Sequence, residues 1–216
     1  MGVAAVAAPP GDLTGHRLDV DGQTVRMRIE LRTEATSPEL VLRPWREDDL
    51  DALVEAYRDP VLQRWTRYPV QTADQGRQWL ERTRQDWDDG RRLSFAVLED
   101  GADGPQLVAN VVLKGVTPGV TVAEVGYWTA AWARGRGVAP RAVTALSRWA
   151  FEQFTGLERL DLLHQVDNPA SCRVAEKSGY LFQEVLPAYP PFPRDGHRHA
   201  LTAPGLVAAT VSGRAR

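Results

Sequence analysis

A turn rich in glycine and arginine is the segment of this 216-residue chain whose residue types best suit anion binding. It spans residues 132–140, with Arg134, Gly135, Arg136 and Gly137 at its centre. The surrounding pattern places it between a strand and the first turn of a helix. Amides of a first helical turn lack intrahelical partners, and glycine lets an oxygen approach the backbone closely. Arginine adds charge-assisted contacts, so the segment predicts a phosphate-binding loop.

Two common phosphate motifs do not fit this turn. A P-loop needs lysine and a hydroxyl residue after its last glycine, but Gly137 is followed by Val138 and Ala139. The dinucleotide-binding fingerprint needs a third glycine where this chain has Pro140. The spacing that remains is Arg-x-x-Gly-x-Ala, formed by Arg134, Gly137 and Ala139.

This spacing resembles the acetyl-CoA pyrophosphate loop of the GNAT superfamily of N-acetyltransferases. Residues 124–128, 168–171 and 177–180 also resemble the RimJ/RimL-like branch, which acetylates the N-termini of ribosomal proteins. The resemblance covers about residues 39–203. It implies acetyl transfer from acetyl-CoA to a primary amine, of a protein N-terminus or a small molecule, by direct attack in a ternary complex. The alternative hypothesis is a catalytically silent acyl-CoA-binding sensor or scaffold.

The resemblance implies a cofactor site made mostly of backbone groups. Family members bind acetyl-CoA where two parallel central strands separate, which here are residues 120–128 and 157–164. The backbone of Trp128 and Thr129 and the residue Asn168 would contact the pantetheine arm. An amide near Tyr127 would polarise the thioester carbonyl, because donors fixed where negative charge develops assist acyl transfer. The pyrophosphate would bind to the loop residues Arg134, Gly135, Arg136, Gly137, Val138 and Ala139.

Two side chains are candidates for moving protons. An amine is mostly protonated at pH 7 and needs a base or a water chain before it can attack. Glu124 is expected on the same strand face as Trp128, although an ion pair with an arginine of a neighbouring strand, or exposure to solvent, explains it equally well. By the resemblance, Ser171 returns a proton to the CoA sulfur, and capping of the helix is its ordinary alternative role. A related branch carries a tyrosine acid seven residues after Asn168, where this chain has Ala175.

The acceptor pocket is, by the resemblance, built from two loops over residues 63–71 and 187–197. Both loops are aromatic, which suits the wall of a pocket, although a proline-rich surface turn has the same composition. Their substrate-binding candidates are Trp65, Tyr68, Tyr189 and Phe192.

Cysteine and histidine form no recognisable metal motif in the sequence. Cys172 is the only cysteine, which excludes an intrachain disulfide and suits a reducing cytoplasm. No sequence feature pairs it with a base, so we do not expect it to carry an acyl group. His164 ends a core strand and is expected in the wall of the cleft. His197 and His199 lack a local third ligand, so no metal is expected.

Composition fits one domain with an additional segment. Residues are 43% hydrophobic and 25% charged, and no apolar run approaches the roughly 20 residues of a membrane-spanning helix. Residues 1–10 lack the basic region of a signal peptide. The 26 lysines and arginines against 28 acidic residues give a net charge of -2, hence no basic field for nucleic acid or anionic lipid. We expect a cytoplasmic protein without nucleic-acid or membrane partners.

Hydrophobic periodicity predicts the elements that position these residues. Helices are expected over residues 47–58, 72–90, 140–156 and 169–178. Strands are expected over residues 39–43, 93–98, 106–114, 120–128, 157–164, 180–185 and 197–202. The fold class is α/β (α+β). The resemblance implies a GNAT fold, in which a mixed, mostly antiparallel sheet is splayed between its fourth and fifth strands and carries helices on both faces.

The N-terminal residues have a different pattern. Residues 25–31 alternate between apolar and charged side chains, and Asp21-Gly22 suits a tight turn. We therefore expect an N-terminal β-hairpin extension over residues 1–38, before the acetyltransferase domain of residues 39–203 and a tail of residues 204–216. An added strand must pair with something, so the extension should cover an open sheet edge or cross to a second copy of the chain in a homodimer.

Overall fold

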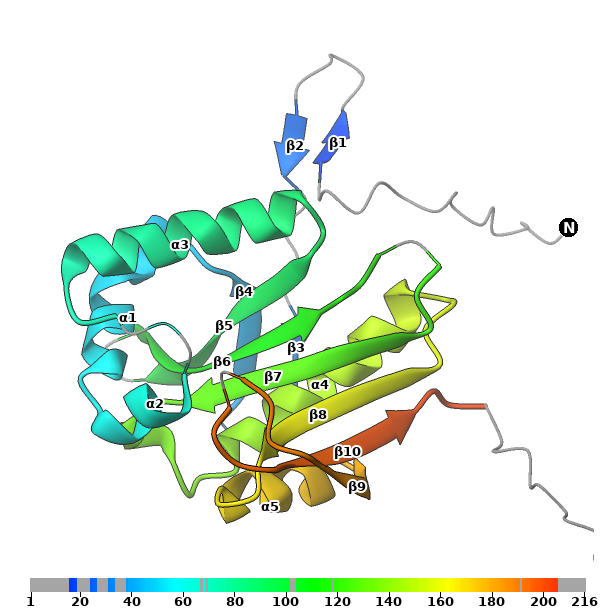
Figure 1. Ribbon diagram of the computed structural model, residues 1–216. Coiled ribbons are helices and arrows are strands. Elements are labelled where there is room, and N and C mark those ends of the chain that lie inside the picture. Colours follow the sequence, from blue (N-terminus) through cyan, green and yellow to red (C-terminus); the bar gives the residue numbers. More distant parts are fainter. Residues whose placement is uncertain are drawn as a thin grey trace, which may run out of the picture.

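An eight-stranded mixed sheet forms the centre of the molecule, with helices on both of its faces (Figure 1). The computed structural model describes residues 16–18, 24–26, 31–33, 38–66, 68, 70–101, 104–117, 119–190 and 192–205. None of the helices in this part of the chain combines the length and the apolar character that a membrane-spanning helix needs.

The sheet has the strand order β3-β4-β5-β6-β7-β8-β10-β9. Its strands are β3 (Leu31–Arg32), β4 (Leu40–Pro44), β5 (Arg92–Gly101), β6 (Gly104–Lys114), β7 (Val122–Thr129), β8 (Arg159–Gln165), β9 (Leu181–Leu186) and β10 (Gly196–Thr202). All neighbours are antiparallel except β7 and β8, which are parallel. These two are the fourth and fifth strands of the expected domain, so the predicted mixed, mostly antiparallel sheet is confirmed.

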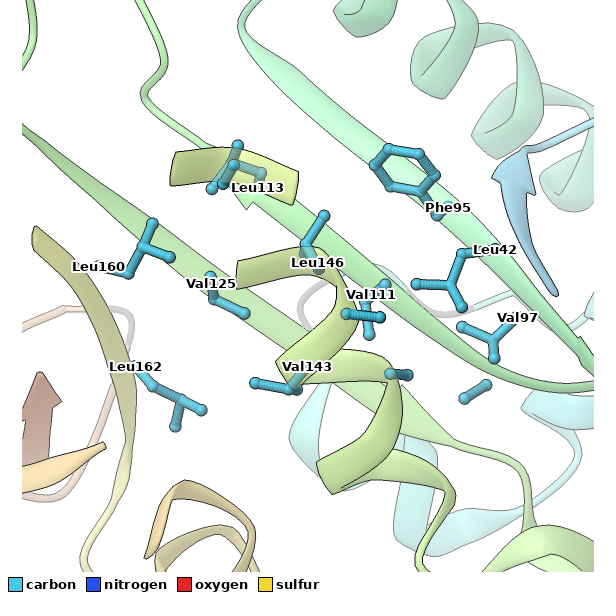
Figure 2. Packing of buried hydrophobic residues seen from close by; sticks show 14 of the residues in the cluster. Leu42, Phe95, Val97, Val111, Leu113, Val125, Val143, Leu146, Leu160 and Leu162 are labelled. Atoms are coloured by element: carbon cyan, nitrogen blue, oxygen red, sulfur yellow. The ribbon is translucent and has the colours of Figure 1, made fainter. Parts of the chain in front are cut away.

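Helices pack on the two faces in separate groups. One face carries α1 (Leu50–Tyr57), α2 (Pro60–Trp65) and α3 (Ala73–Asp88), and the other carries α4 (Val138–Gln153) and α5 (Pro169–Lys177). Short 3-10 turns, η1 (Glu47–Asp49) and η2 (Ala131–Ala133), precede α1 and α4. Each group has its own apolar core. Figure 2 shows Val143 and Leu146 of α4 lying over Val111, Val125 and Leu160 of the sheet.

The helix ends follow local hydrogen bonding, with one departure from expectation. As predicted, α3 begins where Thr72 accepts a hydrogen bond from the amide of Gln75, at 3.2 Å. The helix expected over residues 47–58 ends just before Asp59-Pro60, and no helix was expected to follow it directly, but these two residues begin α2. The Asp59 carboxylate accepts from the amides of Val61 and Leu62, each at 3.1 Å, and proline fits the first helical position because it needs no amide partner.

The N-terminal extension contains two short paired strands, as the predicted hairpin requires. Strands β1 (His16–Leu18) and β2 (Thr24–Arg26) form a two-stranded antiparallel sheet, whereas the predicted turn at Asp21-Gly22 and residues 27–30 lie outside the described residues. Next, β3 pairs with β4 at the edge of the main sheet. The extension thus covers a sheet edge, one of the two arrangements that we expected, and the homodimer stays a prediction.

A buried hydroxyl pair joins α4 to the turn after α5. Tyr180 Oη and Ser147 Oγ lie 2.7 Å apart, and Ser147 in turn donates to the carbonyl of Val143 at 2.8 Å. The side chains are 1% and 2% exposed. The tyrosine hydroxyl therefore depends on the serine, whereas the serine has a second partner.

We predict unequal stability losses for the two single deletions. Ser147→Ala leaves a buried tyrosine hydroxyl without a partner, so the free energy of unfolding should fall by about 1–3 kcal/mol. Tyr180→Phe leaves Ser147 bonded to Val143 and should cost only about 0.5–1.5 kcal/mol. Urea unfolding of both variants measures the difference, and a larger loss for Tyr180→Phe would contradict this arrangement.

Candidate active site

The parallel strands β7 and β8 separate at one end of the sheet. Their pairing ends at Val125 and Leu162, although β7 continues to Thr129 and β8 to Gln165. Beyond this point β7 remains paired with β6, and β8 remains paired with β10. The expected splay between the fourth and fifth strands is therefore present, and it leaves a wedge between two strand edges.

Backbone groups of β7 face into this wedge at alternate residues. Just before β7, the carbonyl of Thr121 accepts hydrogen bonds from the amides of Glu158 and Arg159, at 2.8 and 3.1 Å. Because backbone groups point to alternate sides along a strand, the amides and carbonyls of the odd-numbered β7 residues also point toward β8. Ala130 donates instead to a β6 carbonyl, at 2.9 Å. Tyr127 and Thr129 therefore present amides to the wedge beyond the last β8 partner.

The same alternation corrects one expectation. The backbone of Trp128 faces Asn110 on β6, so of the two residues expected to bind pantetheine through their backbone only Thr129 faces the wedge. The indole of Trp128 is 8% exposed and packs at 5.8 Å, between ring centroids, against Tyr57 of α1. Trp128 is thus a core residue that positions β7.

The predicted phosphate-binding loop opens at the same end of the sheet. Gly135 and Gly137 have φ angles of +75° and +76°, which side chains rarely adopt, and Gly137 is the N-cap of α4. In the described part of the chain, no backbone carbonyl accepts from Gly135, Arg136 or Gly137. Val138 and Ala139 follow in the first turn of α4, where amides lack intrahelical partners. The loop therefore offers a row of amides to an anion.

Both arginines of the loop are held by carboxylates. Arg134 pairs with Asp59, the N-cap residue of α2, and Arg136 pairs with the buried Glu99 of β5. Burial favours the neutral form of Asp59, but hydrogen bonds from Arg134 and from the α2 amides outweigh it and lower the pKa of this carboxyl. The arginine side chains are still 37% and 43% exposed, so each guanidinium has further N–H groups for an anion.

Glu124 on β7 has a side chain that is 35% exposed, and it has a basic partner. It forms an ion pair with Lys114, its register neighbour on β6. An arginine was the partner considered from the sequence. The pair borders a hollow of about 250 Å³ lined by Lys114, Gly115, Val122, Ala123, Glu124, Asp161 and Leu163. A Cβ on Gly126 would lie 3.1 Å from the Lys114 ammonium, so glycine provides space for that side chain.

Ser171 is connected to the other side of the wedge. Its hydroxyl accepts a hydrogen bond from Tyr127 Oη at 2.9 Å, which links α5 to β7. The capping of α5 is carried out by Asn168, whose side chain accepts from the Ser171 amide at 3.3 Å. Burial raises the pKa of Tyr127. Ala175 stands where the related branch carries its tyrosine acid. In this chain it is fully buried and is part of the core.

The two loops expected to form the acceptor pocket meet at one carboxylate. Asp167, between β8 and α5, accepts from Arg64 of α2 at 2.9 Å and lies 3.2 Å from Arg194 of the loop before β10. The loops expected over residues 63–71 and 187–197 are thereby joined over one end of the sheet.

The aromatic candidates on these loops remain open to solvent. Tyr68, Tyr189 and Phe192 are 46%, 75% and 54% exposed. Trp65 ends α2, and the guanidinium of Arg64 lies 4.6 Å from the centroid of its ring.

A group of histidine and cysteine side chains was missed by the sequence analysis. His164 of β8, Cys172 of α5, and His197 and His199 of β10 place their donor atoms within 4.8 Å of one another. We call these four residues the His/Cys cluster. His197 and His199 have no third ligand nearby in the sequence, but in the folded chain two further donors reach them from β8 and α5. The sequence held one signal for this cluster. Three of the four histidines, and the one cysteine, lie between residues 164 and 199.

Comparison with known proteins agrees with this architecture. A family model described as an acetyltransferase (GNAT) domain matches residues 39–181. The comparison with curated proteins gives no match. Among solved structures, a candidate ribosomal-protein-serine acetyltransferase from Vibrio cholerae is 24% identical, with a TM-score of 0.69 over 81% of this chain and 97% of its own.

Two further structures were solved with forms of coenzyme A. RimL, a ribosomal-protein α-N-acetyltransferase in complex with coenzyme A, is 18% identical, with a TM-score of 0.68 over 79% of this chain and 97% of its own. RimJ of Mycobacterium smegmatis, in complex with CoA disulfide, is 23% identical, with a TM-score of 0.68 over 83% of this chain and 88% of its own. At these identities the likeness shows the fold. The similar structures include RimL and RimJ, which belong to the RimJ/RimL-like branch that the motifs resemble. Because the family model covers about two thirds of the sequence, the chain belongs to the GNAT acetyltransferase family and is an N-acetyltransferase.

Proposed function

We propose that this enzyme transfers the acetyl group of acetyl-CoA to a primary amine by direct attack in a ternary complex. One observation carries the proposal: the wedge between β7 and β8 opens at the same end of the sheet as the amide row of residues 135–139. A long ligand with a diphosphate at one end and a thioester at the other matches this arrangement. The two RimJ and RimL neighbours, which were solved with coenzyme A, support the choice of donor.

The donor would be held mainly by the main chain. The amides from Gly135 to Ala139 bind the diphosphate, and the exposed sides of Arg134 and Arg136 add charge. The amides of Tyr127 and Thr129 face the pantetheine and the thioester carbonyl. Asn168, at the start of α5, lies across the wedge as a further pantetheine contact.

Glu124 is proposed as the base. As the amine nitrogen attacks the thioester carbon, a C–N bond forms, the C–S bond breaks, and the nitrogen must lose a proton. Glu124 already accepts an ammonium group, that of Lys114, at the edge of the hollow. The acceptor amine would make the same kind of contact with this carboxylate before it loses its proton.

Ser171 is proposed as the group that returns a proton to the leaving thiolate. Its hydroxyl accepts from Tyr127 Oη at 2.9 Å, which leaves the serine's own proton free to be donated toward the wedge. The tyrosine would then return a proton to the serine and regain its own from solvent, so that the pair does the work of the acid missing at Ala175.

The acceptor is proposed to be a primary amine at the exposed end of a larger molecule, with a protein N-terminus as the first choice. Of the candidate residues, Tyr68, Tyr189 and Phe192 are exposed and Trp65 ends α2, which suits an extended peptide better than an enclosed small molecule. The RimL neighbour is an α-N-protein acetyltransferase, which supports this choice. We propose that the enzyme works in the cytoplasm, without a nucleic-acid or membrane partner.

An acetylation assay tests this function. The enzyme is incubated with acetyl-CoA and matched pairs of acceptors: short peptides with free or blocked N-termini, polyamines and aminoglycosides. We expect free thiol to be released only with a free primary amine, and fastest with the free peptides. Absence of thiol release with every amine, in protein that binds CoA, would contradict the proposal.

We predict that Gly137→Val weakens CoA binding about 5-fold to 100-fold. The positive φ of Gly137 disfavours a β-branched residue by about 1–3 kcal/mol, and relief of that strain would turn the loop amides away from the diphosphate. Gly119→Val is the matched control, because Gly119 has a φ of +83° in the turn between β6 and β7. Calorimetric titration with CoA separates the two, and equal affinities for Gly137→Val and the wild type would contradict the site.

We predict that Glu124→Gln lowers kcat about 100-fold to 10,000-fold at saturating acceptor, because the variant cannot take a proton. Lys114→Gln removes only the ion-pair partner and should keep kcat within a few-fold of wild type. The double variant should be as slow as Glu124→Gln. If Lys114→Gln restores the rate of the double variant, then Glu124 serves only to balance the lysine charge, and it is not the base.

A further inference from the structure

The His/Cys cluster lies between α5 and the strands β8 and β10, and none of its four side chains is assigned to acetyl transfer. His164 and His197 are register partners on β8 and β10, and His199 follows two residues later on the same face. Cys172 reaches them from α5. Donor atoms from three separate elements, β8, β10 and α5, therefore converge on one point.

The spacing of the donor atoms is that of a metal site. Cys172 Sγ lies 3.4 Å from His164 Nε2 and 3.3 Å from His197 Nδ1, and the Nε2 atoms of His164 and His199 are 3.3 Å apart. A tetrahedral zinc ion with Zn–N near 2.1 Å and Zn–S near 2.3 Å requires N···N of about 3.4 Å and N···S of about 3.6 Å. The remaining pairs lie within 4.8 Å, so small side-chain rotations would complete the tetrahedron.

The surroundings of the cluster orient its ligands. His164 Nδ1 lies 2.8 Å from the carbonyl of Gln165 and can donate to it, which leaves the Nε2 lone pair directed into the cluster. A carbonyl partner of this kind is the usual support of a metal-bound histidine. The ring of Phe182 on β9 packs at 5.3 and 5.6 Å, between centroids, against His197 and His199. His199 itself is 1% exposed.

A cysteine–histidine nucleophile is the competing interpretation. It would need Cys172 and one base, and two histidines do lie within 3.4 Å of the sulfur. It leaves unexplained why His199 is buried with its Nε2 against that of His164. A cation coordinated by one thiolate and three imidazoles accounts for all four side chains.

We propose that His164, Cys172, His197 and His199 bind a Zn²⁺ ion as a closed structural site. All four coordination positions come from the protein, which is the pattern of structural rather than catalytic zinc. The ion would fasten α5 to β8 and β10. Because Ser171 precedes Cys172, this would also fix the serine hydroxyl against Tyr127.

Metal titration of the full chain without a histidine tag tests the site independently of acetyl transfer. Protein is freed of metal with a chelator and titrated with Co²⁺, whose thiolate charge-transfer and tetrahedral bands report the ligands. We expect saturation at one ion per chain, displacement of Co²⁺ by Zn²⁺, and a higher melting temperature with Zn²⁺. Cys172→Ser should lose the charge-transfer band, and His199→Gln should lose the melting shift. His16→Gln, which changes the remaining histidine in β1, should behave as wild type.

The wild-type thiol gives a second readout that needs no variant. Cys172 is the only cysteine and is partly exposed, so a thiol reagent reports on it alone. Zn²⁺ should suppress its reaction, and a chelator should restore it. Folded protein with no cobalt thiolate band and an unprotected thiol would overturn the proposal, as would a Zn²⁺ melting shift of equal size in wild type and His199→Gln.

Discussion

The structure depends on the break in pairing between the parallel strands β7 and β8. After Val125 and Leu162 the parallel strands β7 and β8 no longer share hydrogen bonds, because each follows its other neighbour. Polar backbone groups in a sheet are expensive to leave without partners, so such an opening persists only where the rest of the fold holds it. Here the two cores on either face of the sheet hold β7, and the Tyr127 to Ser171 hydrogen bond spans the gap. The opening supplies the amides that the proposed chemistry needs, and α4 begins beside it.

Charge in this site is balanced before any ligand arrives. Arg134 and Arg136 are paired with Asp59 and Glu99, and Glu124 is paired with Lys114. The ion pair of Arg134 also fixes the loop to the start of α2, because Asp59 caps that helix. In the proposed complex these pairs leave the arginines to orient the turn, and the main-chain amides to make most of the anion contacts.

Local patterns predicted most of the fold, and long-range pairing accounts for what they missed. The predicted strands and helices agree with the structure because alternation and helical periodicity are local, as is the cap at Thr72. Helix α2 was missed because Pro60 suits both the end of one helix and the start of another. The Lys114 partner of Glu124 and the His/Cys cluster depend on strand register and on the placement of α5, which no local pattern contains.

The central claim is that the amides of Tyr127, Thr129 and residues 135–139 receive coenzyme A. Amide hydrogen exchange resolved by residue tests it most directly, with the free enzyme and the enzyme saturated with CoA compared at one pH. The account predicts strong protection of these amides by CoA, with little change in the turn around Gly119 at the other end of β7. Unchanged exchange at these amides, in protein that binds CoA, would contradict it.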